Sequence, residues 1–569
     1  MAKAVKGAMR RNLRCLADYK YDVLVVGGGI YGVWCAWDAA LRGLSVALLD
    51  KGDFGHGTSA NNLKIIHGGL RYLQHGDLRR MRESIRERSI LMQVAPHLVH
   101  PLAFVMPTYR HARPGKAMMA AALAMNDLVG FDRNRSKDPK KRLPAGRVVS
   151  KGECLRLLPG IDARELTGGA IWYDCQMSNS DRFILSVLRS AAEAGAETAN
   201  YVEVVGFRVE RNRVTGVRAR DVLADQEFDV RAEVVVNTSG PWADRVLGLV
   251  KGCGLAQRFS KAMNLVTRRR IHAGYAVGVS SRLQFNDHDA VMDKGARLLF
   301  VTPWHKGTII GTTHLPFEGG PENYRVTESD IRDFVRQINE AYPAIDLKRE
   351  DVSFFHGGLL PANGGLNGTD GVSLLKRHRV VDHMTEDRIE GLVSVIGVKF
   401  TTARAVARSV VDLVCRKVGR GSAPRSLTEK TAIHGGQIDA LDPFIARETR
   451  RRPHGMDADQ VGGLIHNHGS AYTELLGYLD QAPVWGEPLG DGTAVIKAEV
   501  LHGIREEMAQ KLGDVVMRRT QLGSTGHPGE PCLRACADIM SREMGWNEAR
   551  TRKELDEVRA IFSPTESTA

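Results

Sequence analysis

Residues 21–50 read YDVLVVGGGIYGVWCAWDAALRGLSVALLD, and this stretch decides the fold. Residues 21–26 form a short, β-branched, mostly apolar run, which is typical of a buried parallel strand. A glycine-rich turn follows, and residues 31–41 predict a helix that ends at Gly43. Residues 45–49 predict a second strand, which closes with Asp50. The order strand, turn, helix, strand is a βαβ unit and predicts an α/β fold.

The turn places Gly27, Gly29 and Gly32 in the pattern G-x-G-x-x-G. The first glycine permits a tight turn, the second lets the backbone approach a pyrophosphate, and the third lets the helix pack closely on the strand. The helix N-terminus offers free N–H groups to phosphates, and Asp50 is placed to accept ribose hydroxyls. A glycine pattern alone is weak, but the strands, helix and acid are all present. The sequence therefore predicts dinucleotide binding without separating NAD from FAD.

Composition limits the class of partner. The chain has 569 residues, of which 43% are hydrophobic and 25% charged, as in a soluble protein of more than one domain. The net charge of +13 indicates an anionic partner: a phosphorylated substrate, an anionic membrane surface or nucleic acid. A solvated basic surface is the alternative reading. Because no nucleic-acid-binding motif is present, nucleic acid is the least favoured partner.

The eight cysteines indicate a reducing compartment. They are scattered apart from Cys532 and Cys536, no CxxC occurs, and no Cys/His group has metal-ligand spacing. We therefore expect no metal site and a cytoplasmic setting. The sequence also has no signal-peptide pattern and no apolar run long enough to span a membrane.

The chain divides into three predicted parts. Residues 1–20 read as a basic helical extension, residues 21–425 as the dinucleotide-binding region with a second subdomain, and residues 430–569 as a mainly helical domain. The boundary is predicted where the composition shifts to Gly, Ser, Pro, Thr and Lys, near residues 420–435. In the last part, residues 497–522 carry one long amphipathic helical pattern.

Residues 57–73 read GTSANNLKIIHGGLRYL, a mixture of small residues, hydroxyls and cations that can follow a long cofactor or form an ordinary loop. This stretch closely resembles the flavin-contacting segment of the FAD-dependent, respiratory glycerol-3-phosphate dehydrogenases. The resemblance continues, in order, through residues 95–107, 234–242, 300–314, 396–407 and 498–522. It therefore covers most of residues 21–569.

The resemblance implies a fold and a reaction. The fold would be a glutathione-reductase-like FAD-binding Rossmann domain with an inserted, mainly antiparallel substrate domain, followed by a C-terminal α-helical domain. The reaction would be hydride transfer from C2 of sn-glycerol 3-phosphate to flavin N5, which gives dihydroxyacetone phosphate. The electrons would pass to a quinone or another acceptor.

Motif and resemblance together predict the site residues. Lys399, His67 and Arg71 are the predicted catalytic residues, and a cation near the flavin would stabilise its reduced, anionic form. The predicted substrate contacts are Arg71, Tyr72, Arg377 and Asn264. Guanidinium suits phosphate because its donors form a rigid fork. The predicted cofactor-binding residues are Gly27, Gly29, Gly32, Asp50, Lys51, Thr58, Ser59, Lys64, His67, Ser239, Gly240, Lys399, Thr401 and Thr402.

Three positions depart from the family pattern. Asn264 stands where the family has a histidine at the substrate site, Leu360 replaces the arginine of a G-V-R-P motif, and His314 replaces the aspartate of G-T-T-D. Asparagine cannot act as a general base, and leucine cannot hold a phosphate. The cations of residues 376–379 are candidates to compensate for Leu360. The candidate bases are His67, His314 and His356.

These departures leave other functions open. One is a flavin enzyme that acts on a different secondary alcohol or amine. Another is a flavin-binding partner subunit without catalysis, and a third is an NAD dehydrogenase. A homodimer is also left open.

Two basic segments predict peripheral binding to the inner face of the cytoplasmic membrane. Residues 1–20 carry an apolar stripe among lysines and arginines, and residues 114–142 pair an apolar segment with a basic tail. For the first segment the alternatives are docking on its own domain and fraying. For the second the alternative is an ordinary helix followed by a solvated loop.

Overall fold

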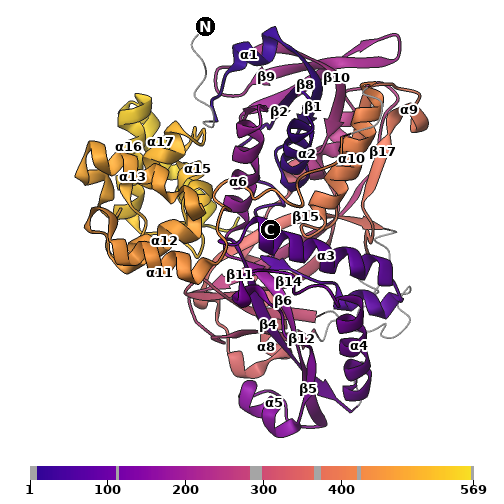
Figure 1. The fold of residues 1–569 in the computed structure, drawn as a ribbon, viewed down its shortest axis with the longest axis vertical. Helices are drawn as coiled ribbons and strands as arrows, with labels where there is room; N and C mark the ends of the chain where they lie inside the picture. Colours follow the sequence, from indigo (N-terminus) through magenta and orange to yellow (C-terminus); the bar gives the residue numbers. More distant parts are fainter. Residues whose placement is uncertain (1–8, 111–114, 282–297, 364–372, 420–423, 566–569) are drawn as a thin grey trace.

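The computed structural model describes residues 9–110, 115–281, 298–363, 373–419 and 424–565. Within these residues the strands form two sheets, and the chain ends in a helical domain (Figure 1). This arrangement confirms the predicted fold class.

The first sheet is built on parallel strands in the order β17-β18-β10-β1-β2-β7, with only β17 antiparallel to its neighbour. The hairpin of β8 and β9 extends it from β10. The bounds of its strands are β1 (Lys20–Val26), β2 (Val46–Leu49), β7 (Glu197–Ala199), β8 (Val202–Glu210), β9 (Arg213–Asp221), β10 (Gln226–Asn237), β17 (Arg379–Asp382) and β18 (Leu392–Ile396).

Strand β1 is buried on both faces, as its apolar run predicts. Alternate side chains of a strand point to opposite faces, so Val23 and Val25 pack in one core and Leu24 and Val26 in another. Helices α2 (Ile30–Leu41), α6 (Ser180–Glu193) and α10 (Ala403–Lys417) cover the first face. The second face packs against the β8–β9 hairpin, α1 (Leu13–Asp18) and α7 (Ala243–Leu247).

The second sheet is the inserted substrate domain, in the order β16-β15-β11-β14-β13-β12-β4-β6-β3, with β5 paired to β6. All of its pairings are antiparallel except that of β4 with β12. Its strands are β3 (Ile65–Ile66), β4 (Val99–Tyr109), β5 (Arg147–Val149), β6 (Leu166–Met177), β11 (Arg258–Thr267), β12 (Tyr275–Ser280), β13 (Leu298–Trp304), β14 (Gly307–Phe317), β15 (Val352–Asn363) and β16 (Ser373–Leu374). Around it lie α3 (Leu78–Val94), α4 (Lys116–Val129), α5 (Lys151–Leu157) and α8 (Glu328–Ala341).

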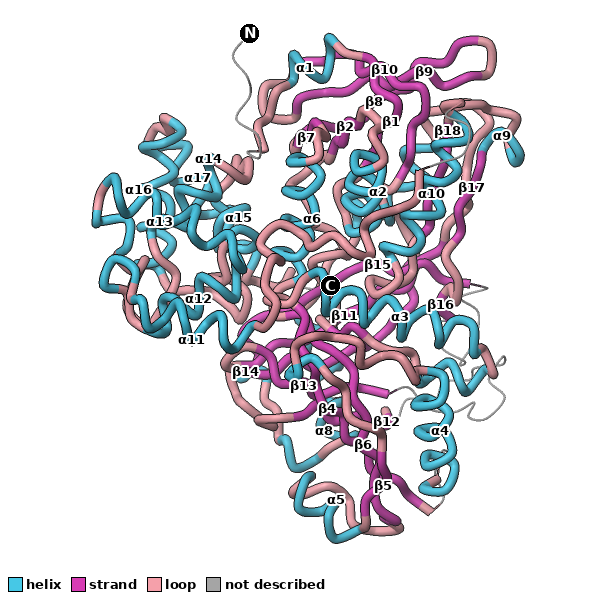
Figure 2. The backbone as a smooth tube through the Cα atoms, viewed as in Figure 1, coloured by secondary structure: helices cyan, strands magenta, loops and turns pink. Residues whose placement is uncertain are grey.

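The C-terminal domain lies beside α6 of the first domain (Figures 1 and 2). Its own apolar side chains form two cores. Its helices are α11 (Leu441–Arg451), α12 (Ala458–His468), α13 (Tyr472–Gln481), α14 (Lys497–Arg505), α15 (Leu512–Asp514), α16 (Glu530–Met544) and α17 (Glu548–Ile561).

The long pattern of residues 497–522 is not one helix. Helix α14 ends at Arg505, and the chain resumes with α15 and a π-helical turn, Val515–Arg519. Between them Met508 has a left-handed φ of 57°, and the buried carboxylate of Glu507 pairs with Arg182 of α6. The tertiary ion pair therefore outweighs the local helical pattern.

The described part of the N-terminal extension packs on its own chain. Met9 and Leu16 are buried, and Arg11 pairs with Asp221 of β9. Helix α1 has only six residues. Residues 9–20 therefore dock on the protein itself. The first part of the apolar stripe predicted for residues 1–20 lies outside the described residues. No helix in the described part of the chain is long and apolar enough to cross a membrane.

Candidate active site

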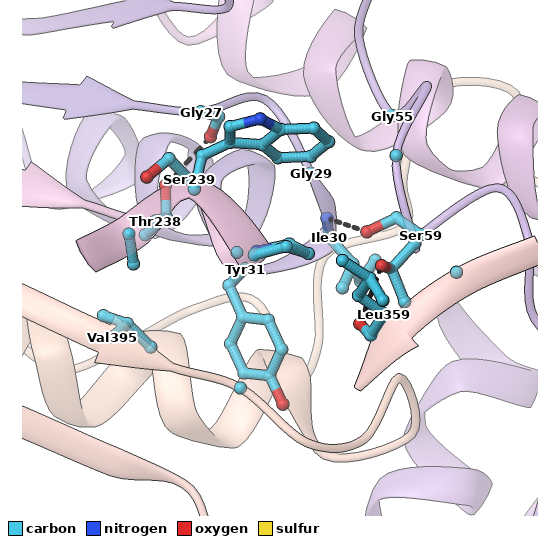
Figure 3. Close-up of a pocket in the computed structure, with 18 of the residues that line it drawn as sticks. Gly27, Gly29, Ile30, Tyr31, Gly55, Ser59, Thr238, Ser239, Leu359 and Val395 are labelled. Atoms are coloured by element: carbon cyan, nitrogen blue, oxygen red, sulfur yellow. Dashed lines mark hydrogen bonds between the residues drawn. The ribbon is translucent and has the colours of Figure 1, made fainter. Parts of the chain in front are cut away.

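A cavity of about 700 Å³ is lined by residues of both sheets. From the first domain come the glycine turn, the end of β2, residues 55–63 and residues 238–246. From the substrate domain come Asn264, Thr312, His314 and residues 358–361, while residues 395–401 run from the end of β18 into the loop after it. In Figure 3 the glycine turn, Ser59 and Leu359 border the same pocket as Tyr31 and Val395.

Each of the three motif glycines suits its position for a different physical reason. Gly27 has a φ of 102°, and a Cβ there would lie 2.8 Å from the Cα of Ser239. A Cβ on Gly32 would lie 1.9 Å from the carbonyl oxygen of Gly27, so only glycine lets α2 begin so close to the turn. Gly29 lines the cavity, and its added Cβ would come near only the Ser59 Oγ, at 3.1 Å. Gly27 and Gly32 thus shape the turn, and Gly29 leaves room for a ligand.

Asp50 stabilises the same turn. Its carboxylate accepts the N–H of Gly28 at 2.6 Å and that of Gly52 at 2.9 Å, and it also lines the cavity. Burial raises the pKa of Asp50, while the His56 charge and these N–H donors oppose that rise. The N–H of Ile30 donates to Ser59 Oγ at 3.1 Å (Figure 3), which joins residues 55–59 to the start of α2.

The residues present fit a dinucleotide such as FAD. The N-cap residue of α2, Gly29, makes no side-chain cap hydrogen bond, and the N-terminus of the helix faces the cavity through Gly29 and Ile30. The indole Nε1 of Trp242, also in the lining, is buried and has no hydrogen-bond partner among the described residues. The cavity volume lies within the range of about 300–1,000 Å³ that is usual for cofactor sites. Lys51, Ser239 and Gly240, which the sequence predicts to bind the cofactor, lie in the lining of the cavity.

The segment after residue 57 connects the two domains across the cavity. Thr58 Oγ1 donates to the carbonyl oxygen of Leu359 in β15 at 3.0 Å. The side-chain nitrogen of Asn264 in β11 donates to the carbonyl oxygen of Asn61 at 3.2 Å. His67, at the far end of the segment, also lines the cavity. One continuous stretch therefore runs from the dinucleotide turn to the substrate domain.

His67 and Lys399 are two ionisable residues of the lining with shifted pKa values. Burial lowers the pKa of His67 to about 4, with Asp174 opposing this and Lys399 reinforcing it, so the imidazole is neutral at pH 7. Burial lowers the pKa of Lys399 to about 8, with the Arg80 charge reinforcing this, so the ammonium is charged at pH 7. The Lys399 Nζ lies 4.0 Å from the ring centre of Tyr72. A neutral base and a cation thus share one cavity.

Tyr31 holds the loop that carries Lys399. Its hydroxyl donates to the carbonyl oxygen of Lys399 at 2.8 Å and accepts the N–H groups of Val398 and Lys399, both at 3.1 Å. The position of Tyr31 in the first turn of α2 is the only hint in the sequence. Its contact with a loop more than 360 residues away required the structure.

The departures from the family pattern lie on the wall formed by the substrate domain. Asn264, Leu360 and His314 all line the cavity. The side-chain oxygen (Oδ1) of Asn264 accepts a hydrogen bond from the hydroxyl of Thr312 at 2.7 Å, so both the oxygen and the nitrogen of the side-chain amide are hydrogen-bonded. His356 does not line the cavity; it lies opposite Asn264 in β15, and burial lowers its pKa well below the ordinary value.

Several predicted residues lie away from the lining. The Lys64 ammonium is buried and donates to Ala60 and to the Ser180 hydroxyl. Arg377 has 77% of its side chain exposed and pairs with Asp77 at 3.2 Å. Arg71 is exposed in the 3-10 helix Leu70–His75, and Tyr72 is buried between Arg80 and Lys399. Thr402 is the N-cap residue of α10, and Gly32 lies inside α2.

A glycine turn at a cavity shared by two sheet domains is typical of dinucleotide-binding oxidoreductases. A family profile described as "FAD dependent oxidoreductase" matches residues 22–413. A second, described as "C-terminal domain of alpha-glycerophosphate oxidase", matches residues 426–551.

The chain is similar to several glycerol-3-phosphate dehydrogenases over nearly its whole length. The Synechocystis enzyme is 33% identical over 96% of this chain and 97% of that protein. The Mycobacterium leprae enzyme is 31% identical over 96% and 88%, and the mitochondrial enzyme of Mus musculus 31% over 94% and 72%. The solved glycerol-3-phosphate dehydrogenase of Bacillus halodurans, complexed with FAD, has a TM-score of 0.75, 23% identity and coverage of 98% and 97%, which shows a shared fold. The chain belongs to the family of FAD-dependent glycerol-3-phosphate dehydrogenases.

Proposed function

We propose that this FAD-dependent enzyme oxidises sn-glycerol 3-phosphate to dihydroxyacetone phosphate. The proposal is carried by the similarity of both domains to relatives named glycerol-3-phosphate dehydrogenase, which extends from bacteria to mammals. The cavity supports it, since a neutral His67 and a charged Lys399 line the same space as the glycine turn.

His67 is proposed to accept the proton of the C2 hydroxyl group as that carbon is oxidised. FAD supplies the acceptor for the hydride that leaves C2. Lys399 contributes a positive charge beside the site where negative charge accumulates, and such fixed charges often provide the largest share of catalysis. Tyr31 keeps this ammonium in place by holding its backbone.

The phosphate group is proposed to bind near three basic residues outside the lining, Arg71, Arg80 and Arg377. Arg71 is exposed, Arg80 reaches the Tyr72 ring, and Arg377 is exposed beside Asp77. Guanidinium groups at a solvent-facing edge can attract and orient a phosphate without being buried.

Steady-state turnover tests the function. FAD-loaded enzyme supplied with sn-glycerol 3-phosphate and an artificial electron acceptor should produce dihydroxyacetone phosphate. The enantiomer, sn-glycerol 1-phosphate, is the matched control and should be a poor substrate. Absence of turnover by FAD-loaded protein would contradict the proposal.

A second candidate function is the oxidation of a different secondary alcohol or amine. It is favoured by Asn264 and Leu360, because both line the cavity and neither can supply the base or the cation found in relatives of this type. A panel of polyol phosphates, free polyols and amines, compared by kcat/KM, would identify it.

We also propose that the electrons pass to a quinone. A second proposal is that the end of α4 and the residues after it dock on an anionic lipid surface. Leu128 and Phe131 have 68% and 76% of their surface exposed, and the exposed cations Arg135, Lys137 and Lys140 follow. Lys141 takes no part, since its buried ammonium donates to the carbonyl oxygens of Pro96 and Val99.

An apolar surface beside cations suits an anionic bilayer. Sedimentation with phosphatidylglycerol vesicles should show binding that weakens at high salt. The double variant Leu128→Ser, Phe131→Ser should bind less, and salt-independent or absent binding of the wild type would contradict the proposal.

A further inference from the structure

Asp53 connects the FAD-binding domain to the C-terminal domain. Its side chain is completely buried, at the end of the turn that follows β2. It accepts hydrogen bonds from Arg518 Nε and from both terminal nitrogens of Arg519, one of them at 2.8 Å. The amide of Asn200 adds a further donor at 3.0 Å. Two consecutive arginines of the C-terminal domain thus hold one carboxylate of the first domain.

This carboxylate anchors the residues that line the cofactor cavity. The carbonyl oxygen of Asp53 accepts the N–H of His56, and the N–H of Gly55 donates to the carbonyl oxygen of Gly28 in the glycine turn at 3.1 Å. Phe54 is buried and packs so closely under Gly28 that an added Cβ there would lie 2.7 Å from its ring. The lining residues at 55–59 follow directly.

The backbone of the C-terminal domain is shaped for this contact. Residues at consecutive positions of a regular helix point about 100° apart, yet Arg518 and Arg519 reach the same carboxylate. They end the π-helical turn Val515–Arg519, in which the N–H of Thr520 bonds to the carbonyl oxygen of Val515 at 3.0 Å. Single π-helical turns are rare and occur often at functional sites.

The cluster is electrostatically balanced. Arg518 also donates to the carboxylate of Asp514 at 2.8 Å, and the hydroxyl of Tyr201 donates to the Asp514 carboxylate at 2.7 Å. Burial alone would raise the pKa of Asp53, but the charges of Arg519 and Arg518 outweigh burial and hold it well below the usual range. The Asp53 carboxylate is therefore ionised and bound to both arginines at neutral pH.

We propose that Arg518 and Arg519 are positioning residues for FAD: by holding Asp53 they fix residues 50–59 against the glycine turn, so that cofactor retention depends on the docked C-terminal domain. Neither arginine lines the cavity. The pair acts on the cofactor only through Asp53 and the residues that follow it.

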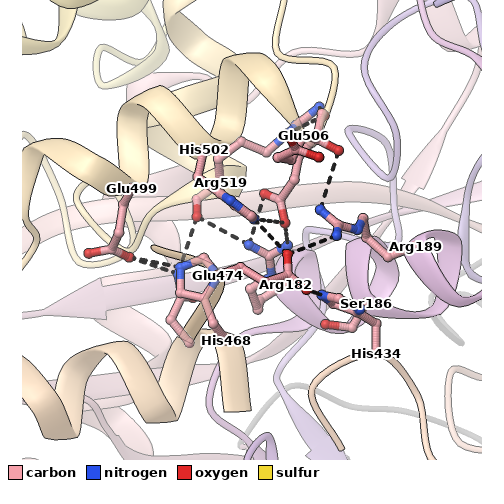
Figure 4. Close-up of polar contacts among 12 residues, drawn as sticks. Arg182, Ser186, Arg189, His434, His468, Glu474, Glu499, His502, Glu506 and Arg519 are labelled. Carbon is pink, nitrogen blue, oxygen red and sulfur yellow. Dashed lines mark hydrogen bonds and ion pairs between the residues drawn. The ribbon is translucent and has the colours of Figure 1, made fainter. Parts of the chain in front are cut away.

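The same interface provides a matched control. Figure 4 shows Arg182 and Arg189 of α6 reaching residues of the C-terminal domain. Arg189 donates to Glu474 at 3.0 Å and to the carbonyl oxygen of Glu506, and its side chain is only 3% exposed. It joins the same two domains but makes no hydrogen bond to residues 50–59.

The test compares FAD affinity in Arg518→Met and Arg189→Met, measured by flavin fluorescence during reconstitution of the apoprotein. Arg518→Met removes the hydrogen bonds of Arg518 to Asp53 and Asp514 from a buried network and should raise the Kd of FAD about tenfold, and Arg518→Lys should recover part of the loss. Arg189→Met should leave the Kd of FAD within about twofold of the wild-type value, even if its thermal midpoint falls as far as that of Arg518→Met. Equal Kd changes in the two methionine variants, or an unchanged Kd in Arg518→Met, would overturn the proposal.

A second measurement uses the unmodified chain and covers the case in which a variant does not fold. If docking and FAD binding are linked, FAD must slow amide hydrogen exchange in residues 515–520 as well as in residues 52–60. Unchanged exchange at residues 515–520 on FAD binding would also overturn the proposal. Neither readout requires turnover, so both are independent of the substrate.

Discussion

The two walls of the cavity differ in how tightly their residues are determined. On the dinucleotide wall, Gly27 and Gly32 leave no space for even one added carbon, and Asp50 holds two backbone N–H groups. On the substrate wall, Asn264, His314 and Leu360 line the cavity and depart from the pattern that the resemblance implies. Packing thus excludes any larger residue at the two glycines of the first wall, whereas the second wall carries different side chains at three positions.

The largest effect should come from adding a methyl group to the dinucleotide wall. In Gly32→Ala the new Cβ would meet the carbonyl oxygen of Gly27 at 1.9 Å, so the turn must move. We expect a loss of about 3 kcal/mol or more in stability, with little FAD retained. Gly462→Ala is the control: in helix α12 nothing lies within 4 Å of the added carbon, so stability should be kept or rise. FAD-to-protein ratios and thermal midpoints measure both, and a Gly32→Ala protein with normal FAD content would break the comparison.

The next effect concerns the cation between the walls. Lys399→Met should lower kcat with sn-glycerol 3-phosphate by about 10²–10³-fold, because a fixed charge beside the reacting atoms is lost. FAD affinity should change little, since the glycine turn is untouched. Lys399→Arg, which keeps the charge, should retain more activity. A kcat unchanged in Lys399→Met would remove this residue from the chemistry.

The pH dependence should show both ionisable groups. His67 must be neutral to accept a proton, so kcat/KM should fall as pH drops through about 4. Lys399 must be charged, so kcat/KM should fall as pH rises through about 8. Each limb should approach a tenfold change per pH unit. Lys399→Arg should move the alkaline limb upward, and an unmoved limb would assign it to another group.

The smallest effect should come from the substrate wall. Leu360→Arg places a guanidinium at the cavity, and one charge-assisted phosphate contact should lower KM for sn-glycerol 3-phosphate by about tenfold. FAD content should be unaffected, since the dinucleotide wall is separate. Leu360→Met is the control for side-chain size. A raised KM in Leu360→Arg, with FAD retained, would favour the alternative substrate class.

The dinucleotide wall could be predicted from the sequence because its determinants are local. Strand β1, the glycines and helix α2 follow one another, and each was expected within a residue or two of its observed bounds. The mainly antiparallel second sheet followed from the resemblance, whereas the mainly helical C-terminal domain was predicted from the sequence pattern itself.

The remaining features depend on distant contacts. Residues 497–522 carry a continuous helical pattern, yet the Glu507–Arg182 pair breaks it, and that pair spans 325 positions. The Lys64 ammonium donates to the hydroxyl of Ser180, a contact that the sequence near Lys64 does not indicate. The contact between Asp53 and Arg518 spans 465 positions, and nothing near either residue indicates it.

The most direct test of the account is anaerobic titration of the FAD-loaded enzyme with sn-glycerol 3-phosphate, followed by absorbance of the flavin. The oxidised flavin bands should bleach, and dihydroxyacetone phosphate should appear in equal amount. Flavin that stays oxidised with sn-glycerol 3-phosphate, but is reduced by dithionite or by another alcohol or amine, would contradict the assigned substrate.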